Sequence, residues 1–388
     1  MDEIRVGLVG LGRRSGSWIR ILQQIKGHRI TAICDPIVAL HEQALSKLAH
    51  TEEVRVYDKY EDVLADPNVD AIALCVRSMS QGGMAAQALD AGKHVHAEVP
   101  AAHSMEDCWR IVAAAERSGL VYHLAEQTRY WGFVEDWRNL VASGRLGRIT
   151  LCEGQYFHYY PQHYFQDPKT GRFYGPDELA SHPEAKPACL QFMPPIHYLP
   201  HELGPMLKVL DDRVVEVTAM STPSPSWVHP EIAQPDMQMA LMKTERGTIL
   251  RMAVSFVQPH PPRDLHWYQV VGTRGCVEWT RSRRELSKMW LADSQAHGMT
   301  EVDWRWERTD APPEAHGAGH GEADYYVHAA FRDAVLGIKP AEFDIYRAME
   351  TAAPAILAAQ SIEQGSNLLR APDFRPGKNR RPGEMPKP

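Results

Sequence analysis

The protein has 388 residues, of which 44% are hydrophobic and 23% are charged, and its formal net charge is −7. This length suffices for two well-packed domains, and an acidic balance without a long run of one sign argues against a protein built to hold nucleic acid. No apolar run has membrane-spanning length, no signal peptide precedes the first strand, and the six cysteines lack metal or redox spacing. We therefore expect a cytoplasmic protein with reduced thiols, no metal and no membrane partner.

The first half of the chain alternates strand-like and helix-like segments. Because continuous apolar strands separated by amphipathic helices are typical of a parallel sheet covered on both faces, we predict a doubly wound α/β Rossmann domain over residues 1–127. The predicted strands are short and apolar: Ile4–Val9, Ile30–Cys34, Val54–Tyr57, Ala71–Val76, His94–Ala97 and Val121–Ala125. The predicted helices have apolar residues at helical spacing: Ser15–Ile25, Pro36–Leu48, Tyr60–Ala65, Met84–Ala91 and Ser104–Ser118.

The pattern changes after a further predicted helix at Phe133–Ser143 and a long, aromatic-rich strand at Ile149–Tyr160. Residues 161–196 are rich in Pro, Asp, Gly and His, which predicts a long excursion without a compact element. Strands without intervening helices then indicate a mostly antiparallel open sheet, completing an α+β domain over residues 128–370. The remaining predicted elements are strands Val214–Met220, Met237–Lys243, Ile249–Val257, Trp267–Val271 and Cys276–Thr280, and helices Ala323–Leu336 and Ile345–Glu363.

Two expectations concern what lies outside these domains. Residues 371–388 are rich in proline and basic residues, which predicts an extended tail. An open sheet face in the second domain is usually covered by another surface, so we expect a homo-oligomer, either a dimer or a tetramer.

A glycine-rich segment joins the first predicted strand to the first predicted helix. Gly10 and Gly12 match the dinucleotide-binding fingerprint, whose third glycine falls at Gly16, one residue late. Gly10 permits the tight turn, and Gly12 lets backbone N–H groups approach a pyrophosphate whose charge the helix N-terminus favours. Ser15, in the usual place of the third glycine, is small enough for close packing and can donate a hydrogen bond. This order of strand, turn and helix predicts a bound dinucleotide.

An acidic residue indicates which dinucleotide is bound. Asp35 ends the second predicted strand, at about the 20-residue spacing that the fingerprint requires. A carboxylate there can bind both ribose hydroxyls of NAD and repels a 2′-phosphate, so we prefer NAD over NADP. Arg13 and Arg14 complicate this preference, because their guanidinium groups could accept a phosphate.

The glycine loop, Asp35–Pro36 and the segment AGKHVHAEVP at residues 91–100 together resemble the Gfo/Idh/MocA oxidoreductases, which include glucose–fructose oxidoreductase and inositol dehydrogenase. The resemblance runs from residue 4 to about residue 365. It implies NAD-dependent hydride transfer to and from a small sugar or cyclitol. It also places Glu98 and Pro100 at the nicotinamide end of the cofactor site.

The chain departs from that family at two positions. Val99 stands where most dehydrogenases of the family have a lysine that is assigned to the catalytic site, and Gln81 stands where many relatives have a histidine. Because valine can neither donate nor accept a proton, the ordinary family mechanism does not transfer to this chain.

The sequence motifs of this chain are more similar to those of one branch of the family. The segments 98–109, 153–158, 198–205 and 319–321 resemble the NAD-dependent α-N-acetylgalactosaminidases, which are thought to oxidise a sugar hydroxyl transiently. The resemblance implies that the active-site positions of that branch are occupied here by Glu126, Tyr156, Tyr198 and His201.

The chemistry of alcohol oxidation agrees with this set. A base must take the hydroxyl proton while hydride leaves, and His201 can do so near neutral pH because its unperturbed pKa is about 6.5. Tyr198 lies three residues earlier and could share a helical face with His201. Glycosidic cleavage needs at least one more acid or base, for which Tyr156 and Glu126 are both candidates. Further residues expected to contact substrate are His158, His197 and His320.

Three functions follow as hypotheses. The first is an NAD-dependent oxidoreductase that removes hydride from a secondary alcohol carbon of a sugar, cyclitol or glycoside. The alternative is an NAD-requiring glycosidase that cleaves its substrate by transient oxidation at C3 followed by elimination. A second alternative is a non-catalytic NAD-binding sensor, because fold alone does not establish activity.

Overall fold

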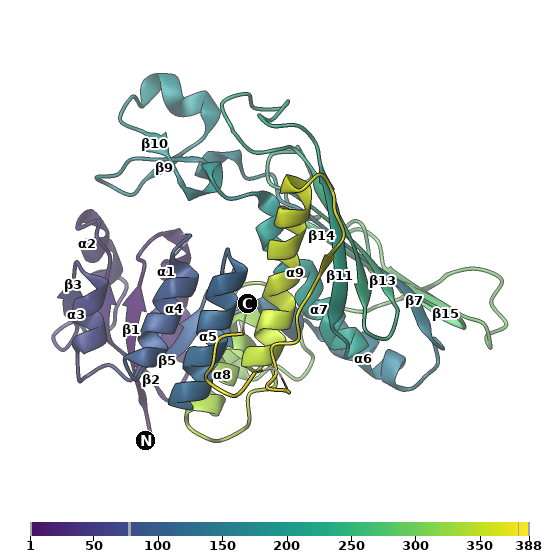
Figure 1. Cartoon of the computed structure of the whole chain (residues 1–388), viewed down its shortest axis with the longest axis horizontal. Coiled ribbons are helices and arrows are strands. Elements are labelled where there is room, and N and C mark those ends of the chain that lie inside the picture. The colour runs from purple at the N-terminus through teal and green to yellow at the C-terminus, as the bar shows by residue number, and fades with distance from the viewer. Residues whose placement is uncertain (1, 77–78, 379, 387–388) are drawn as a thin grey trace.

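The N-terminal part of the protein is a six-stranded parallel sheet with strand order β3-β2-β1-β4-β5-β6. We describe residues 2–76, 79–378 and 380–386 of a computed structural model (Figure 1). This order and the parallel pairing confirm the predicted doubly wound sheet. The strands are β1 (Ile4–Val9), β2 (His28–Cys34), β3 (Arg55–Tyr57), β4 (Ala71–Leu74), β5 (His94–Ala97) and β6 (Tyr122–Leu124).

Helices cover both faces of this sheet, because right-handed crossovers turn to opposite faces on either side of β1. Local signals set their ends: Ser104 caps α5 by accepting the Asp107 N–H at 3.1 Å, and Gly119 ends it with φ +66°. The helices are α1 (Arg13–Gln24), α2 (Ala39–Leu45), α3 (Tyr60–Ala65), α4 (Gln81–Asp90) and α5 (Met105–Ser118).

The second sheet has nine strands in the order β17-β16-β15-β14-β7-β13-β12-β11-β18. All neighbouring pairs are antiparallel except β7 with β13, which confirms the predicted mostly antiparallel sheet. Three of its strands, β16, β17 and β18, were not predicted. The bounds are β7 (Ile149–Phe157), β11 (Val214–Ser221), β12 (Gln238–Thr244), β13 (Ile249–Ser255), β14 (His266–Gly272), β15 (Gly275–Glu278), β16 (Ser287–Leu291), β17 (Thr300–Val302) and β18 (Leu369–Arg370).

Of the helices of the second half, α7, α8 and α9 lie between the two sheets (Figure 1). Helix α9 packs on both α5 and β11, and α8 packs on α1, so one continuous apolar core runs through both halves of the chain. The boundary at residue 128 therefore does not separate two independent cores. These helices are α6 (Gly132–Ala142), α7 (Pro200–Leu210), α8 (Ala323–Val335) and α9 (Ile345–Glu363).

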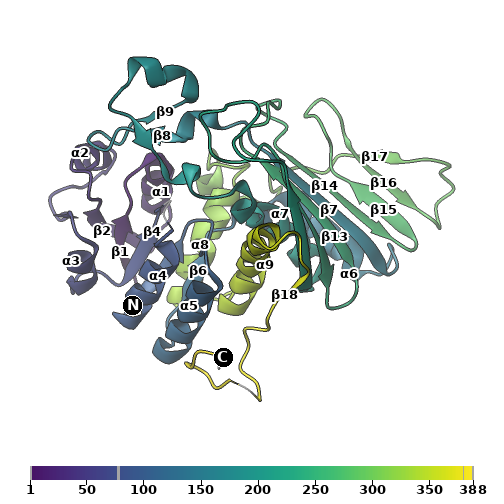
Figure 2. The same ribbon diagram turned by 45° about the horizontal axis from the view of Figure 1, so that its top comes forward.

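Residues 161–196 form a small lobe rather than the structureless excursion expected from composition. The lobe contains the short strands β8 (Phe165–Gln166), β9 (Phe173–Tyr174) and β10 (Lys186–Pro187), joined by 3-10 turns. Figure 2 shows β8 and β9 above α1 and α2. The lobe contacts these helices at two places. Arg13 Nη1 lies 3.2 Å from His163 Nε2. Gly171 packs closely against Leu40, because a Cβ added at Gly171 would lie only 3.0 Å from the Leu40 side chain.

The C-terminal tail is extended, and it packs on its own chain. The Arg380 guanidinium pairs with the buried Glu116 carboxylate on α5 at 2.6 Å, and Phe374 packs against Trp109 of the same helix. Among the described residues, no helix has the length and apolarity needed to span a membrane, and no cluster of His, Cys, Asp or Glu is arranged to hold a metal ion.

A cluster of buried histidines joins the Rossmann sheet to α8. His96 on β5 lies 2.9 Å from His328 on α8 and 3.2 Å from His123 on β6, measured between ring nitrogens. Burial lowers the pKa of His123 and of His328 to about 3, and it lowers the pKa of His28 on β2 to about 4. These imidazoles are therefore neutral in the folded protein at neutral pH.

Candidate functional site

The glycine turn has the geometry of a dinucleotide cradle. Gly10 has φ +85°, and a Cβ there would lie 2.7 Å from the Cys75 carbonyl oxygen, so this position requires glycine. Gly12 is the N-cap of α1, and a Cβ at that position would meet no atom within 4 Å. Open space in front of a helix N-terminus suits a pyrophosphate. The Ser15 hydroxyl, expected as a further donor, instead donates to the Gly12 carbonyl oxygen at 2.6 Å.

Asp35 lies at the carboxyl end of β2 beside this turn. Its Oδ2 accepts the Leu11 N–H at 2.8 Å and its Oδ1 accepts the Ile37 N–H at 2.8 Å. Each oxygen keeps a second lone pair that could accept a ribose hydroxyl. The carboxylate thus shapes the glycine turn and also suits an NAD ribose.

The two arginines after the glycine turn each contact a side chain from another part of the chain. Arg13 points to His163 in the lobe, as described above. Arg14 binds Glu98 at 2.8 Å and Asp324 at 3.0 Å, so it links the Rossmann domain to α8. This arrangement differs from the phosphate contact considered for Arg14 from the sequence.

The segment containing Glu98 and Pro100 is held from both sides. The Glu98 carboxylate accepts hydrogen bonds from Arg14 Nε and from Trp18 Nε1 at 2.9 Å. Gln81 donates to the carbonyl oxygens of Glu98 and Pro100, the latter at 2.7 Å. Gln81, which replaces a histidine common in the family, therefore fixes the backbone on either side of the buried Val99.

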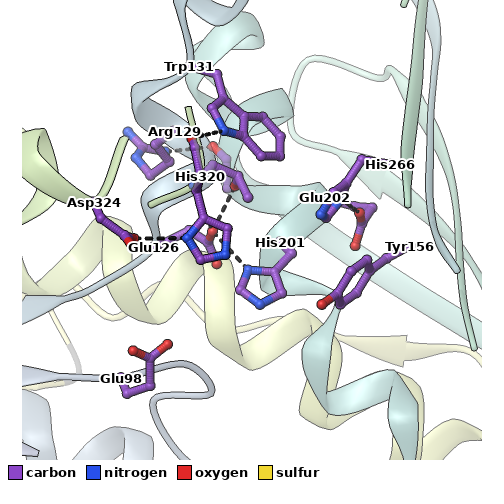
Figure 3. Close-up of polar contacts among 12 residues, drawn as sticks. Glu98, Glu126, Arg129, Trp131, Tyr156, His201, Glu202, His266, His320 and Asp324 are labelled. Carbon is purple, nitrogen blue, oxygen red and sulfur yellow. Dashed lines mark hydrogen bonds and ion pairs between the residues drawn. The ribbon is translucent and has the colours of Figure 1, made fainter. Parts of the chain in front are cut away.

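A buried carboxylate–imidazole pair lies where the two domains meet (Figure 3). His201 Nδ1 donates to Glu126 Oε1 at 3.0 Å, and the Thr128 hydroxyl donates to the same oxygen at 2.7 Å. Burial acts to raise the pKa of Glu126, but the His201 ring and the hydrogen bonds outweigh it and lower that pKa. An ionised Glu126 fixes hydrogen on Nδ1 of His201, which leaves Nε2 able to accept a proton.

Two tyrosines surround His201, as the sequence predicted. The Tyr156 ring on β7 lies edge-on to the His201 ring with centroids 5.2 Å apart, and the Tyr198 ring lies 6.0 Å away. The Tyr156 hydroxyl also lies 2.9 Å from His158 Nδ1, so His158 belongs to the same group. The structure thus brings together five of the predicted residues.

A second carboxylate–imidazole pair lies directly beside the first. Glu202, the residue after His201 on α7, lies 2.9 Å from Nδ1 of His266 on β14. Burial, and secondarily the Glu126 carboxylate, raises the pKa of Glu202 well above its usual range. Burial first, then the charges of His201 and other histidines, lowers the pKa of His266 well below its usual range.

A third imidazole is oriented by an aspartate. His320 Nδ1 lies 3.0 Å from Asp324 Oδ1, and the His320 carbonyl oxygen accepts the Trp131 indole N–H at 3.0 Å. Burial acts to raise the pKa of Asp324, yet His320 and Arg14 lower it well below its usual range. His320 is 41% exposed, so its ring remains accessible to a ligand.

Among the described residues, His197 is the predicted substrate residue for which no hydrogen bond or ring contact to this group is found. Its ring packs 5.2 Å from that of His103, and burial lowers its pKa to about 3. Its Nδ1 is buried and has no hydrogen-bond partner among the described residues. A contact between His197 and substrate therefore stays a prediction from the sequence.

Both halves of the chain match known protein families. Residues 136–381, more than half of the chain, match the family described as glycosyl hydrolase 109, C-terminal domain. The chain belongs to glycosyl hydrolase family 109. Its residues 4–126 match the oxidoreductase family with an NAD-binding Rossmann fold, so the Gfo/Idh/MocA resemblance and the NAD-binding fold are both confirmed.

Relatives in family 109 span nearly the whole chain. A glycosyl hydrolase family 109 protein of Streptomyces niveus is 28% identical, with 98% of this chain and 80% of the relative covered. An α-N-acetylgalactosaminidase of Bacteroides fragilis is 25% identical, with 97% of this chain and 93% of the relative covered.

Solved structures share the fold at lower identity. An oxidoreductase domain protein from Kribbella flavida has a TM-score of 0.75 at 16% identity and covers 96% of this chain and 100% of its own. The WlbA dehydrogenase of Bordetella pertussis, solved with NADH and UDP-GlcNAcA, has a TM-score of 0.68 at 19% identity and covers 95% and 98%.

Several residues of the candidate site were not predicted as site residues from the sequence. Glu202 and His266 were not considered, and Asp324 was not recognised as the partner of His320. One signal pointed to Glu202: Gly154 interrupts strand β7, and a Cβ there would lie 2.9 Å from Glu202. A glycine within a strand often marks such a close approach.

The Arg14 link allows a prediction about stability. We expect Arg14→Met to lower the free energy of unfolding by about 3 kcal/mol, because it leaves the buried Asp324 without a charged partner from α1. Urea unfolding measures this, with Arg20→Met as the control because Arg20 lies on the same helix and is exposed. Equal losses of unfolding free energy in the two variants would contradict a stabilising role for the ion pair between Arg14 and Asp324.

Proposed function

We propose that this protein is an NAD-requiring glycosidase that cleaves a glycoside after transient oxidation of a sugar hydroxyl. The observation that carries the proposal is the buried Glu126–His201 pair, which lies among Tyr156, Tyr198 and His158 at the junction of the two domains. Membership of family 109 supports glycosidic cleavage over net oxidation.

The cofactor cradle fits NAD. Gly10 and Gly12 would receive the pyrophosphate at the N-terminus of α1, and Asp35 would accept a ribose hydroxyl. Bound in this cradle, NAD would supply reversible hydride transfer to and from a sugar carbon, so that no reduced cofactor would accumulate. A Cβ at Gly12 would point into open space, which agrees with room for the pyrophosphate there.

The side chains around His201 supply the proton transfers. His201 accepts the hydroxyl proton at Nε2, because Glu126 keeps hydrogen on Nδ1. Cleavage needs a second group, to remove the proton from the carbon next to the oxidised one. We assign this role to Tyr156, because Glu126 is committed to His201 and Thr128 while the Tyr156 ring contacts His201.

A screen of aryl glycosides, each with NAD added and omitted, tests the proposal. We expect release of the aryl group without accumulation of reduced nicotinamide, and deuterium at C2 of the product sugar when the reaction is run in D2O. Steady accumulation of reduced nicotinamide with a free polyol, and no aryl release, would instead establish a dehydrogenase. The Rossmann fold and its oxidoreductase neighbours are the observations that favour that second function.

We further propose that the protein is a cytoplasmic homo-oligomer. All six cysteines are free thiols, as expected in a reducing compartment. The face of the nine-stranded sheet away from α7 and α9 exposes apolar side chains that a second copy would cover. Light scattering on the purified protein measures the oligomer, and a monomer at micromolar concentration would refute it. The exposed apolar residues are Met220, Met239, Leu241 and Ile249.

A further inference from the structure

The proposed reaction uses His201, Glu126 and Tyr156, and it assigns no role to the pair formed by Glu202 and His266. Helix α7 places His201 and Glu202 next to each other, and their side chains diverge to opposite partners, Glu126 and His266. Glu202 is fully buried, and its Oε2 has no hydrogen-bond partner among the described residues. Glu126 is equally buried, but hydrogen bonds from His201 and Thr128 to its Oε1 favour its anion. At Glu202, burial and the neighbouring Glu126 carboxylate make a second anion costly, so the neutral acid is favoured there.

The neutral acid determines where the hydrogen of the His266 ring lies. A protonated Glu202 donates to Nδ1 of His266, which must then be the acceptor, so the ring hydrogen resides on Nε2. The Tyr268 hydroxyl does not compete strongly for Nδ1, because it lies 3.3 Å from that nitrogen and donates to the His201 carbonyl oxygen at 3.0 Å. His266 is thereby a donor at Nε2.

The His266 ring is fixed in orientation and faces the other groups of the site (Figure 3). It stacks on the Tyr156 ring with centroids 4.4 Å apart and an interplanar angle of 5°, and it meets the Trp131 ring at 5.1 Å. His201, His158 and His320 are all close enough for their charges to lower the pKa of His266. The ring therefore belongs to the same group of imidazoles.

The Nε2 atom of His266 is available to a ligand. It has no hydrogen-bond partner among the described residues, and it is not one of the fully enclosed polar atoms. The side chain is 10% exposed, so a small part of the ring edge remains accessible. A donor in an otherwise packed aromatic site will bind an acceptor when the sugar displaces water.

We propose that His266 donates a hydrogen bond from Nε2 to an oxygen atom of the bound sugar, and that Glu202 is the positioning residue that fixes this tautomer. The acceptor would be a ring hydroxyl or an acylamino carbonyl oxygen. This inference rests on the proposed function for its substrate class, but the tautomer that it requires is a property of the protein alone.

The tautomer is tested first, without any substrate. Two-bond proton–nitrogen NMR spectra of histidine-labelled protein at neutral pH distinguish the two neutral tautomers and the imidazolium, and His266→Phe assigns the signal. We expect hydrogen on Nε2 in the wild type and in Glu202→Gln, whose amide can still donate to Nδ1. An Nδ1–H tautomer or an imidazolium in the wild type would overturn the inference.

Kinetics then test the contact with the aryl glycoside that the wild type cleaves. We expect His266→Phe, which keeps a ring on Tyr156, to lower kcat/KM about 10- to 100-fold, mainly through KM. Glu202→Gln should stay within about threefold of the wild type, whereas Glu202→Leu should lose as much as His266→Phe. His297→Phe, at an exposed position in the loop between β16 and β17, is the matched control.

The outcomes separate this inference from the proposed function. If the wild type oxidises a polyol and cleaves no glycoside, the proposed function fails, and the same variants are compared in polyol oxidation. If the wild type cleaves a glycoside but His266→Phe matches His297→Phe, the contact with the sugar is refuted. Equal damage from Glu202→Gln and Glu202→Leu would refute the neutral-donor role of Glu202.

Discussion

Replacing His201 with asparagine should lower kcat/KM by about 1,000-fold, because a positioned general base contributes about 10²- to 10⁴-fold to a reaction. Asparagine keeps an N–H that can donate to Glu126, but it has no group that accepts a proton where Nε2 stood. Glu126→Gln should cost about 100-fold, because it removes the charge that stabilises the protonated imidazole. Initial rates of aryl-glycoside cleavage measure both effects.

These two substitutions should leave cofactor binding intact. Among the described residues, neither Glu126 nor His201 has a side-chain hydrogen bond to the glycine turn, so the NAD dissociation constant measured by fluorescence quenching should change less than about threefold. Full activity in His201→Asn with NAD bound would remove His201 from the mechanism. A loss of NAD affinity parallel to the loss of rate would instead show a general structural defect.

Mild acid should destabilise this protein well before its carboxylates are protonated. Buried neutral imidazoles have folded-state pKa values of about 3 for His123 and His328 and about 4 for His28, each below the unfolded value of about 6.5. Their stabilisation is fully present above the unfolded pKa and is lost as pH falls toward the folded pKa. Between about pH 6.5 and pH 5, each imidazole should cost about 2 kcal/mol of unfolding free energy.

Urea titrations at a series of pH values measure this loss. His28→Leu provides the matched variant, because both His28 ring nitrogens are buried without a hydrogen-bond partner among the described residues. As the pH falls, the free energy of unfolding of this variant should decrease less steeply than that of the wild type. The difference in slope should correspond to about one fewer proton taken up on unfolding. Asp324 adds a loss only near and below about pH 4, since unfolded aspartate titrates there. A stability that is constant from about pH 7.5 to pH 5 would contradict the assignment of neutral buried histidines.

The Rossmann half could be predicted closely from the sequence because its signals are local. The apolar run Ile4–Val9 is the first strand in the structure, and the glycine turn and α1 follow it directly. Short edge strands were missed: β17 has three residues and β18 has two, too few for a repeating pattern. The lobe over α2 was also missed, because its stability comes from contacts with other elements rather than from its own composition.

Only some residues of the candidate site were predicted from the sequence. Those marked by a family resemblance were predicted, and those whose partner lies far away in the sequence were missed. His201 and Tyr156 were predicted because a family resemblance marks their positions. His266 was missed because its significance comes from Glu202, which lies far away in the sequence and meets it only through packing of α7 on the sheet. The contact of Arg14 with Asp324 was missed for the same reason, since the two residues lie far apart in the sequence and meet only where α8 packs on α1.

The adjacency of His201 and Glu202 limits how this region can diverge. Successive residues of an α-helix are rotated by about 100°, so one inserted or deleted residue in the first turn of α7 would turn both side chains away from Glu126 and His266 together. The two pairs can therefore form together only if the length of the chain between Pro200 and Gly204 stays unchanged.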